Sequence, residues 1–249
     1  MGISGPVSTI FRLLVAMDRF LARELEIIAE MPRYYDWITD KIRPHVGGQV
    51  VEIGAGIGSL SERLLPLSDD LCLVEPSTYF TSVLHQRFGG RDDVFIHNSS
   101  VENYLEASHR GRCNTVVMVN VLEHIKDDAA VLAGVRELLE KGGKLAVFVP
   151  ALPFLYSKLD EVVGHYRRHL RQDLSALLGG AGFEVIDICY MDILGILPWW
   201  LVMTLLGNTT FNRRQVRLYD TVGVPLTRDI QGLFKPGIGK NVLAVAERR

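Results

Sequence analysis

Apolar runs alternate along the chain with segments whose apolar residues recur at helical spacing. The runs are bounded by glycine, proline or charged residues, which is typical of strands buried on both faces. We predict such strands at 49–53, 70–76, 93–98, 113–121 and 144–150, with helices between them at 59–65, 78–88 and 127–143. Regular strand–helix alternation of this kind predicts an α/β fold with a doubly wound, mostly parallel sheet.

The C-terminal part adds a helix at 171–183 and strands at 184–192 and 241–248, which makes seven strands. The last two strands are separated by 193–240, far longer than a hairpin loop. We expect this segment to form a mostly helical cap over the carboxyl ends of the strands. The chain is then one domain over 1–249, with an N-terminal helical part (1–47), a core (48–192), the cap (193–240) and the last strand (241–249).

The N-terminal segment Val7–Met31 is apolar at helical spacing but is interrupted by several charged residues. The charges exclude a secretory signal and a membrane span. The pattern indicates an amphipathic helix, which packs on the body, closes over a substrate or touches a membrane surface. A second short helix at 33–42 precedes the first strand.

Composition narrows the class of protein. The 249 residues are 48% hydrophobic, enough for one full core, and a net charge of −2 gives no reason to expect a nucleic-acid partner. Cys72, Cys113 and Cys189 form no C-x-x-C pair, which favours small buried side chains in a reducing cytoplasm. We find no His, Cys and carboxylate group with metal-ligand spacing, so no metal is expected.

The stretch "VVEIGAGIGSL", Val50–Leu60, joins the first strand to a glycine loop. Gly54, Gly56 and Gly58 read G-x-G-x-G, whereas the dinucleotide fingerprint is G-x-G-x-x-G. Such a loop presents backbone N–H groups to a ligand at the carboxyl end of the strand. Glu52 lies two residues before the loop, and its carboxylate suits a cationic ligand but would repel a pyrophosphate.

An acid also ends the second strand. Glu75 stands where this topology places an acceptor for the hydroxyls of a ribose. Together "VVEIGAGIGSL", "LVEP", "NVLEHIKDD" and "KGGKLAVFVP" resemble, in order and spacing, the motifs of class I S-adenosylmethionine-dependent methyltransferases, over about Tyr34 to Tyr190. The resemblance implies S-adenosyl-L-methionine as cofactor.

By this resemblance, Glu52 and the glycine loop hold the methionine part of the cofactor and Glu75 holds its ribose. Asn120 would contribute a backbone carbonyl near the methionine amine. Many relatives have an acid after the third strand for the adenine amine, and this chain has serines there. A serine hydroxyl can accept the same hydrogen bond, so Ser100 is the expected adenine contact.

The stretch "SKLDEVVGHYRRHL" follows the fifth strand and resembles a G-H-Y-R-R segment of a bacterial subgroup often found beside surface-polysaccharide or natural-product genes. In the functional interpretation, Tyr166, Arg167 and Arg168 bind an anionic group of the acceptor and His165 is the base, with His124 as substitute. In the alternative interpretation, the segment is a solvated helix start, with the tyrosine and one arginine packed structurally.

The segment 193–207 carries no charge and contains Trp199 and Trp200, but it is too short and too broken to span a bilayer. Three interpretations stay open: a lid lining an apolar acceptor pocket, a hairpin on a membrane surface, and packing in the core or in a homodimer. The basic segment 212–220 follows directly. This combination suits a ligand with an apolar body and an anionic head.

We therefore expect a cytoplasmic methyltransferase acting on a small or lipid-like acceptor in natural-product, isoprenoid or surface-glycan biosynthesis. Peripheral membrane contact and homodimer formation stay open. The alternatives are a non-catalytic membrane-associated protein on the same fold and a nicotinamide-dependent oxidoreductase, against which the glycine spacing argues.

Overall fold

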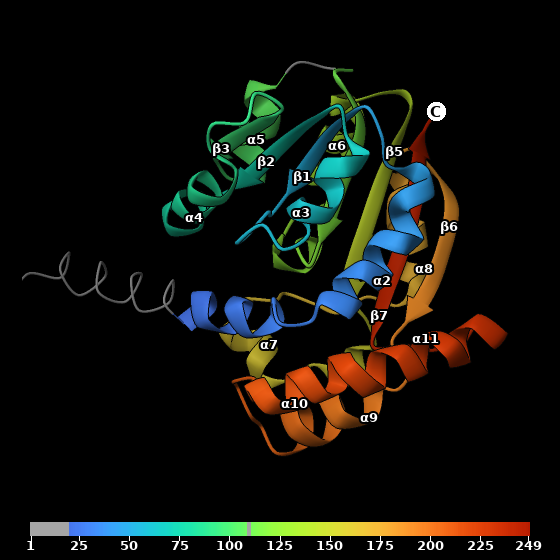
Figure 1. Ribbon diagram of the computed structural model, residues 1–249. Helices are drawn as coiled ribbons and strands as arrows, with labels where there is room; N and C mark the ends of the chain where they lie inside the picture. The colour runs from blue at the N-terminus through green and yellow to red at the C-terminus, as the bar shows by residue number, and fades with distance from the viewer. Residues whose placement is uncertain (1–19, 109–110) are drawn as a thin grey trace, which may run out of the picture.

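The computed structural model describes residues 20–108 and 111–249. It contains a seven-stranded sheet of order β3-β2-β1-β4-β5-β7-β6 (Figure 1). The strands are β1 (Gln49–Ile53), β2 (Asp70–Glu75), β3 (Val94–Asn98), β4 (Cys113–Val119), β5 (Leu139–Pro150), β6 (Phe183–Met191) and β7 (Asn241–Arg248). β7 is antiparallel to both its neighbours, β5 and β6, and the pairs among β1 to β5 are parallel. The predicted doubly wound, mostly parallel sheet is confirmed.

Helices connect the strands. The longer ones are α2 (Pro32–Ile42), α4 (Thr78–Phe88), α5 (Val101–Ala107), α6 (Asp128–Leu138), α8 (Arg171–Gly180) and α11 (Val224–Leu233). The shorter ones are α3 (Ser61–Leu64), α7 (Lys158–Val162), α9 (Ile196–Trp199) and α10 (Arg213–Leu218). Single turns of 3₁₀-helix lie at η1 (Arg43–His45), η2 (Leu65–Leu67), η3 (Leu122–His124) and η4 (Pro153–Leu155), and π-helical turns at η5 (Trp200–Leu205) and η6 (Tyr219–Gly223).

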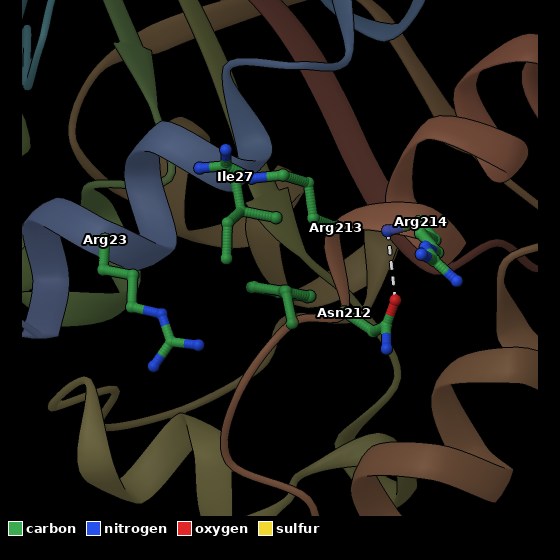
Figure 2. A pocket seen from close by; sticks show the side chains of 6 residues that line it. Arg23, Ile27, Asn212, Arg213 and Arg214 are labelled. Atoms are coloured by element: carbon green, nitrogen blue, oxygen red, sulfur yellow. Dashed lines mark hydrogen bonds between the residues drawn. The ribbon is translucent and has the colours of Figure 1, made fainter.

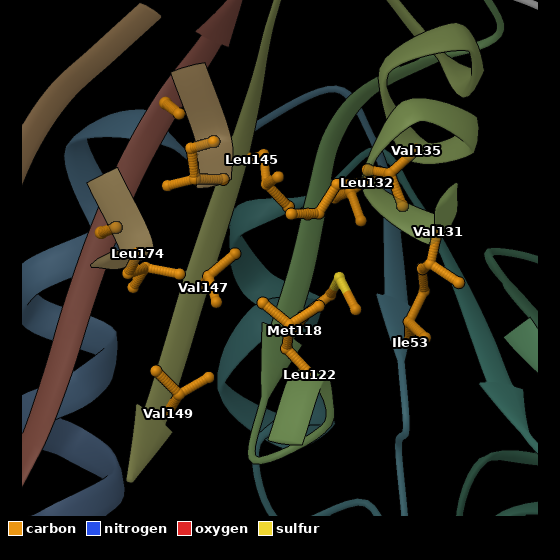
Figure 3. Packing of buried hydrophobic residues seen from close by; sticks show 14 of the residues in the cluster. Ile53, Met118, Leu122, Val131, Leu132, Val135, Leu145, Val147, Val149 and Leu174 are labelled. Carbon is orange, nitrogen blue, oxygen red and sulfur yellow. The ribbon is translucent and has the colours of Figure 1, made fainter. Parts of the chain in front are cut away.

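Helices cover both faces of the sheet. Successive side chains of each strand point to opposite faces, so a strand can contribute to both hydrophobic clusters. On β5, Leu145, Val147 and Val149 join the cluster under α5, α6 and α8 (Figure 3). The intervening Ala146 and Phe148 join the cluster under α2, α3 and α4. Burial on both faces explains why these strands read as continuous apolar runs.

One predicted helix, 127–143, is too long. α6 ends at Leu138 and β5 begins at the next residue, Leu139, which pairs with Cys113 at the start of β4. Gly142 has φ +79°, a conformation that an α-helix does not contain. The pairing of two strands thus overrides the helical propensity of this stretch.

The insertion between β6 and β7 lies at the carboxyl end of the sheet. It contains α9, η5, α10, η6 and α11, which Figure 1 shows together at the lower edge of the molecule. Its last residue, Lys240, accepts a hydrogen bond from the Ala151 backbone N–H just after β5 (2.8 Å). We call the helix over 20–28 the N-terminal helix; the rest of the predicted Val7–Met31 helix, up to residue 19, lies outside the described residues.

A buried carboxylate anchors this insertion. Asp192, directly after β6, accepts hydrogen bonds from the Tyr34 hydroxyl (3.1 Å), the Gly195 backbone N–H (3.1 Å) and the Tyr219 hydroxyl. It also pairs with Lys240 Nζ at 2.7 Å. Both ends of the insertion and α2 therefore meet at one charged group. Within 20–108 and 111–249, no helix is long and apolar enough to cross a membrane.

Candidate functional site

The glycine loop joins β1 to α3, and all three glycines have positive φ: +76° at Gly54, +55° at Gly56 and +84° at Gly58. A Cβ on Gly54 would lie 2.3 Å from Val121 Cγ2, and one on Gly58 would lie 2.6 Å from a ring carbon of α4. A Cβ on Gly56 would have Leu25 Cδ1 of the N-terminal helix as its nearest atom, at 3.7 Å. The outer glycines are thus required for packing, whereas the middle one keeps backbone accessible under the N-terminal helix.

Glu75 reaches from the end of β2 to this loop. Its carboxylate accepts hydrogen bonds from the backbone N–H of Gly56 and of Ser77, each at 2.9 Å. The residue is 6% exposed. A carboxylate has acceptor capacity beyond two such bonds, so Glu75 can hold both the loop and a ligand hydroxyl.

Glu52 lies in the interior beneath the loop. It is 3% exposed, and Ser61 donates its hydroxyl to Oε2 at 2.5 Å. Burial raises the pKa of Glu52 to about 8; the Ser61 hydrogen bond opposes the rise and the charge of Glu75 adds to it. The carboxyl is therefore largely protonated near neutral pH until a cation approaches it.

Asn120 and Ser100 follow the carboxyl ends of β4 and β3, two strands that are separated in the sheet by β1 and β2. Asn120, after β4, is exposed, has φ +54° and donates its N–H to Phe148 O (2.8 Å). Ser100 caps α5, where its hydroxyl accepts the Asn103 backbone N–H at 3.3 Å. The Ser100 hydroxyl, which we expect to contact adenine, therefore already accepts a capping hydrogen bond. Its second lone pair is available to a ligand.

Two histidines predicted as bases come together at the ends of β4 and β5. The ring centroids of His124 and His165 are 4.5 Å apart at an interplanar angle of 82°. Glu123 lies beneath them, 0% exposed, with Oε1 3.9 Å from His165 Nε2. Burial raises the pKa of Glu123 to about 8. The sequence reasoning missed Glu123, although an acid directly before His124 at the end of a predicted strand was an available signal.

Asp160 holds His165 in place and was also missed. Its fully buried carboxylate contacts His165 Nδ1 at 2.8 Å and Arg168 Nε and a terminal nitrogen at 3.1 and 3.0 Å. Ser157 donates its N–H and hydroxyl to the same group (2.8 and 2.7 Å). Burial raises the pKa of Asp160. The hydrogen bond with His165 and the charge of Arg168 together have the larger, opposite effect, and they lower this pKa to about 2. Asp160 is therefore an ionised anchor.

The two arginines of the G-H-Y-R-R stretch have partners inside the protein. Arg168 has a side chain 1% exposed and lies 4.7 Å from the Trp199 ring centroid, besides its pair with Asp160. Arg167 contacts Asp128 at 2.6 Å. Tyr166 points outward and is 56% exposed. The buried Arg168 agrees with the alternative interpretation, in which one arginine is packed structurally, whereas the exposed Tyr166 does not.

The tryptophans of the insertion differ in environment. Trp199 donates its indole N–H to Leu155 O at 3.1 Å and packs against Arg168, whereas Trp200 is 39% exposed. Several apolar neighbours of Trp200 are more exposed still, namely Leu197, Leu205 and Leu206. The segment 193–207 thus has one face packed against the protein and one apolar face exposed to solvent.

A pocket lies between the N-terminal helix and the insertion (Figure 2). Its volume is about 450 Å³, and it is lined by Arg23, Ile27, Phe211, Asn212, Arg213 and Arg214. Arg213 pairs with Glu30 at 3.2 Å, whereas the guanidinium groups of Arg23 and Arg214 have no hydrogen-bond or ion-pair partner in the described part of the chain. The pocket therefore combines apolar side chains with positive charge.

Known proteins resemble this chain in sequence and in fold. Residues 51–145 match a family model described as a methyltransferase domain. A ubiquinone biosynthesis O-methyltransferase of Xanthomonas axonopodis pv. citri is 26% identical over 175 residues, which are 64% of this chain and 72% of that protein. One of Aromatoleum aromaticum is 31% identical over 116 residues, 46% of this chain and 48% of that protein.

Among solved structures, a geranyl diphosphate methyltransferase in complex with S-adenosylmethionine has the same fold, with a TM-score of 0.62 and 15% identity over 88% of this chain and 85% of that one. The glycine loop and the carboxylates of Glu52 and Glu75 lie within the matched domain. From the domain match over 51–145 and the relatives, we conclude that the chain is a methyltransferase with S-adenosylmethionine as its cofactor, on the fold of the solved methyltransferase structures.

Proposed function

We propose that the protein methylates a hydroxyl oxygen of a lipid-like acceptor that carries an anionic group. The observation that carries this proposal is His165, held at Nδ1 by Asp160 and packed against His124. The loop after β4 that carries His124 also carries Val121, whose side chain packs against Gly54. A base for a hydroxyl proton is thus next to the cofactor site. The O-methyltransferase names of the relatives support the same reaction.

For the cofactor, we assign the methionine part to Glu52 and the glycine loop and the ribose to Glu75. The backbone that Gly56 leaves accessible and the carboxylate of Glu75 on its N–H support this orientation. Asn120 and Ser100 stay the proposed contacts of the methionine amine and of adenine. The N-terminal helix, whose Leu25 Cδ1 would lie 3.7 Å from a Cβ at Gly56, would exclude water from the bound ligand.

When bound, S-adenosylmethionine supplies its sulfonium methyl group: an oxygen–carbon bond forms as the carbon–sulfur bond breaks, leaving S-adenosylhomocysteine, a methyl ether and one proton. His165 receives that proton at Nε2, because its Nδ1 is held by Asp160. His124, whose ring packs on His165, is the substitute. Alignment of acceptor and methyl group supplies most of the remaining acceleration.

The pocket of Figure 2 is the proposed site for the anionic group. Arg23 and Arg214 would pair with phosphate or carboxylate oxygens, and Ile27 and Phe211 would contact the apolar body. We propose that the exposed apolar side chains around Trp200 meet the acceptor's chain or the membrane that holds it.

The reaction is tested with methyl-labelled S-adenosylmethionine and three alkyl-chain acceptors bearing a phenol, an amine or an activated carbon. We expect label in a methyl ether of the phenol, together with S-adenosylhomocysteine. Label on nitrogen or carbon with no ether would overturn the proposed O-methylation.

Removing the guanidinium groups of Arg23 and Arg214, which have no partner among the described residues, should affect acceptor binding alone. We expect Arg23→Ala with Arg214→Ala to raise KM at least tenfold for an acceptor with an anionic head, because charge-assisted hydrogen bonds are lost. KM for a neutral analogue and the affinity for S-adenosylhomocysteine should not change. Arg112→Ala, an exposed arginine at the opposite end of β4, is the control. Equal loss for charged and neutral acceptors would exclude this pocket as the anion site.

Cofactor binding should release a proton. Glu52 has a pKa near 8 in the free protein, and the ammonium group of the ligand would stabilise its ionised form. The affinity for S-adenosylhomocysteine should therefore rise as the pH increases from 6 towards about 8, and then level off. Calorimetry at pH 7 in phosphate and in Tris measures the released proton. Glu52→Gln should abolish the difference; proton uptake by the wild type would contradict the assignment.

A further inference from the structure

Three side chains with metal-binding atoms converge at the ends of β4 and β5. Glu123 and His124 belong to η3, and His165 follows α7. One ligand atom from each residue lies within 4.8 Å of the others. A carboxylate with two imidazoles is a ligand set that divalent first-row transition metals prefer. The sequence spacing did not predict a metal here, because His165 comes from a separate segment.

Glu123 independently indicates a missing partner. It is 0% exposed, and neither carboxylate oxygen has a hydrogen-bond partner within the described part of the chain. A buried carboxylate without a partner is costly in free energy. A cation between Glu123 and the imidazoles would supply the interaction that the protein itself does not.

The surroundings of His165 match those of a metal ligand. Its Nδ1 is held by the Asp160 carboxyl group at 2.8 Å, which leaves Nε2 facing Glu123 at 3.9 Å. Carboxylates that hold the second nitrogen of a ligating histidine are a common feature of metal sites, where they fix the tautomer and the ring. Asp160 is itself fixed by Arg168 and Ser157, so the ring is held firmly.

We propose that Glu123, His124 and His165 bind a divalent first-row transition cation, for which Zn²⁺ is the best-matched probe. Zinc bonds of about 2.1 Å place tetrahedral ligands about 3.4 Å apart, so the cluster would contract on binding. His124 is exposed, which leaves the cation open to a further oxygen ligand on the solvent side.

This inference rests on the proposed function only for the cation's role in the reaction. An acceptor hydroxyl bound to the cation loses its proton more readily. With the cation bound, His165 would be a ligand through Nε2 and would not receive the proton there, while the proposed O-methylation itself would be unchanged. The proton then leaves to water.

The test is calorimetry of the chelator-treated full chain with ZnCl₂. We expect one site per chain in the wild type and an affinity at least tenfold lower in Glu123→Gln and in His165→Asn. His124→Asn, on an exposed side chain, should weaken binding without disturbing the fold. His85→Asn, an exposed histidine of α4, is the matched control and should bind as the wild type does.

The inference is overturned if the wild type takes up no Zn²⁺ at 100 µM, or if Glu123→Gln and His124→Asn bind it as tightly as the wild type does. The affinity for S-adenosylhomocysteine, measured on the same samples, verifies that each variant is folded. Ether formation without zinc binding would refute the cation site and leave the proposed function intact. Zinc binding without ether formation would refute the proposed function alone.

Discussion

Asp160→Ala is expected to lower the free energy of unfolding by about 3–5 kcal/mol, the range for breaking a buried ion pair by removing one partner. The Arg168 guanidinium would stay in the interior, where its side chain is 1% exposed, without its counter-charge. The capping bonds to Ser157 and the support of His165 would be lost at the same time. Activity should fall with stability, because His165 is no longer held.

Urea denaturation measures this loss, with Glu161→Ala as control: an exposed carboxylate of the same short helix, α7. If the cost comes from the stranded arginine, adding Arg168→Met to Asp160→Ala should recover part of the stability, since no uncompensated charge remains. A loss below about 1 kcal/mol, typical of an exposed ion pair, would contradict the role given to Asp160.

Glu75→Ala should weaken S-adenosylhomocysteine binding by about 1.5–3 kcal/mol, roughly 10- to 150-fold, as expected for loss of a charged hydrogen bond. The carboxylate is the proposed ribose acceptor and also fixes the backbone N–H of Gly56. Both effects lower affinity, the first by removing a contact and the second by loosening the loop.

Glu75→Gln separates the two contributions, because its amide oxygen can still accept one backbone N–H but presents no charge. We expect an intermediate affinity for Glu75→Gln and an unchanged one for Glu102→Ala, an exposed glutamate of α5. Wild-type affinity in Glu75→Ala would remove the ribose assignment.

The sequence was sufficient for the parallel strands and for the glycine loop between β1 and α3. Strands such as β5 are buried on both faces, so their apolar runs are visible without knowledge of their neighbours. The glycine loop is encoded locally as well, because Gly54, Gly56 and Gly58 each adopt a positive φ that few other residues tolerate.

Sequence reasoning failed where pairing overrides local preference. Leu139 was expected in a helix, yet it pairs with Cys113 in the sheet, a partner that no local pattern around Leu139 reveals. In the sequence, Arg167 and Arg168 look like unpaired basic groups. Their carboxylate partners, Asp128 and Asp160, belong to the helices α6 and α7.

Only the tertiary structure revealed the two groups of side chains that we propose for the acceptor and for a cation. The cluster of Glu123, His124 and His165 forms where the ends of β4 and β5 meet, and the arginine pocket forms where the N-terminal helix meets the insertion. Local chemistry determines which residues build a strand or a tight turn, and the sequence displays it. Burial and charge pairing depend on which distant segments the fold brings into contact, so the sequence alone does not reveal them.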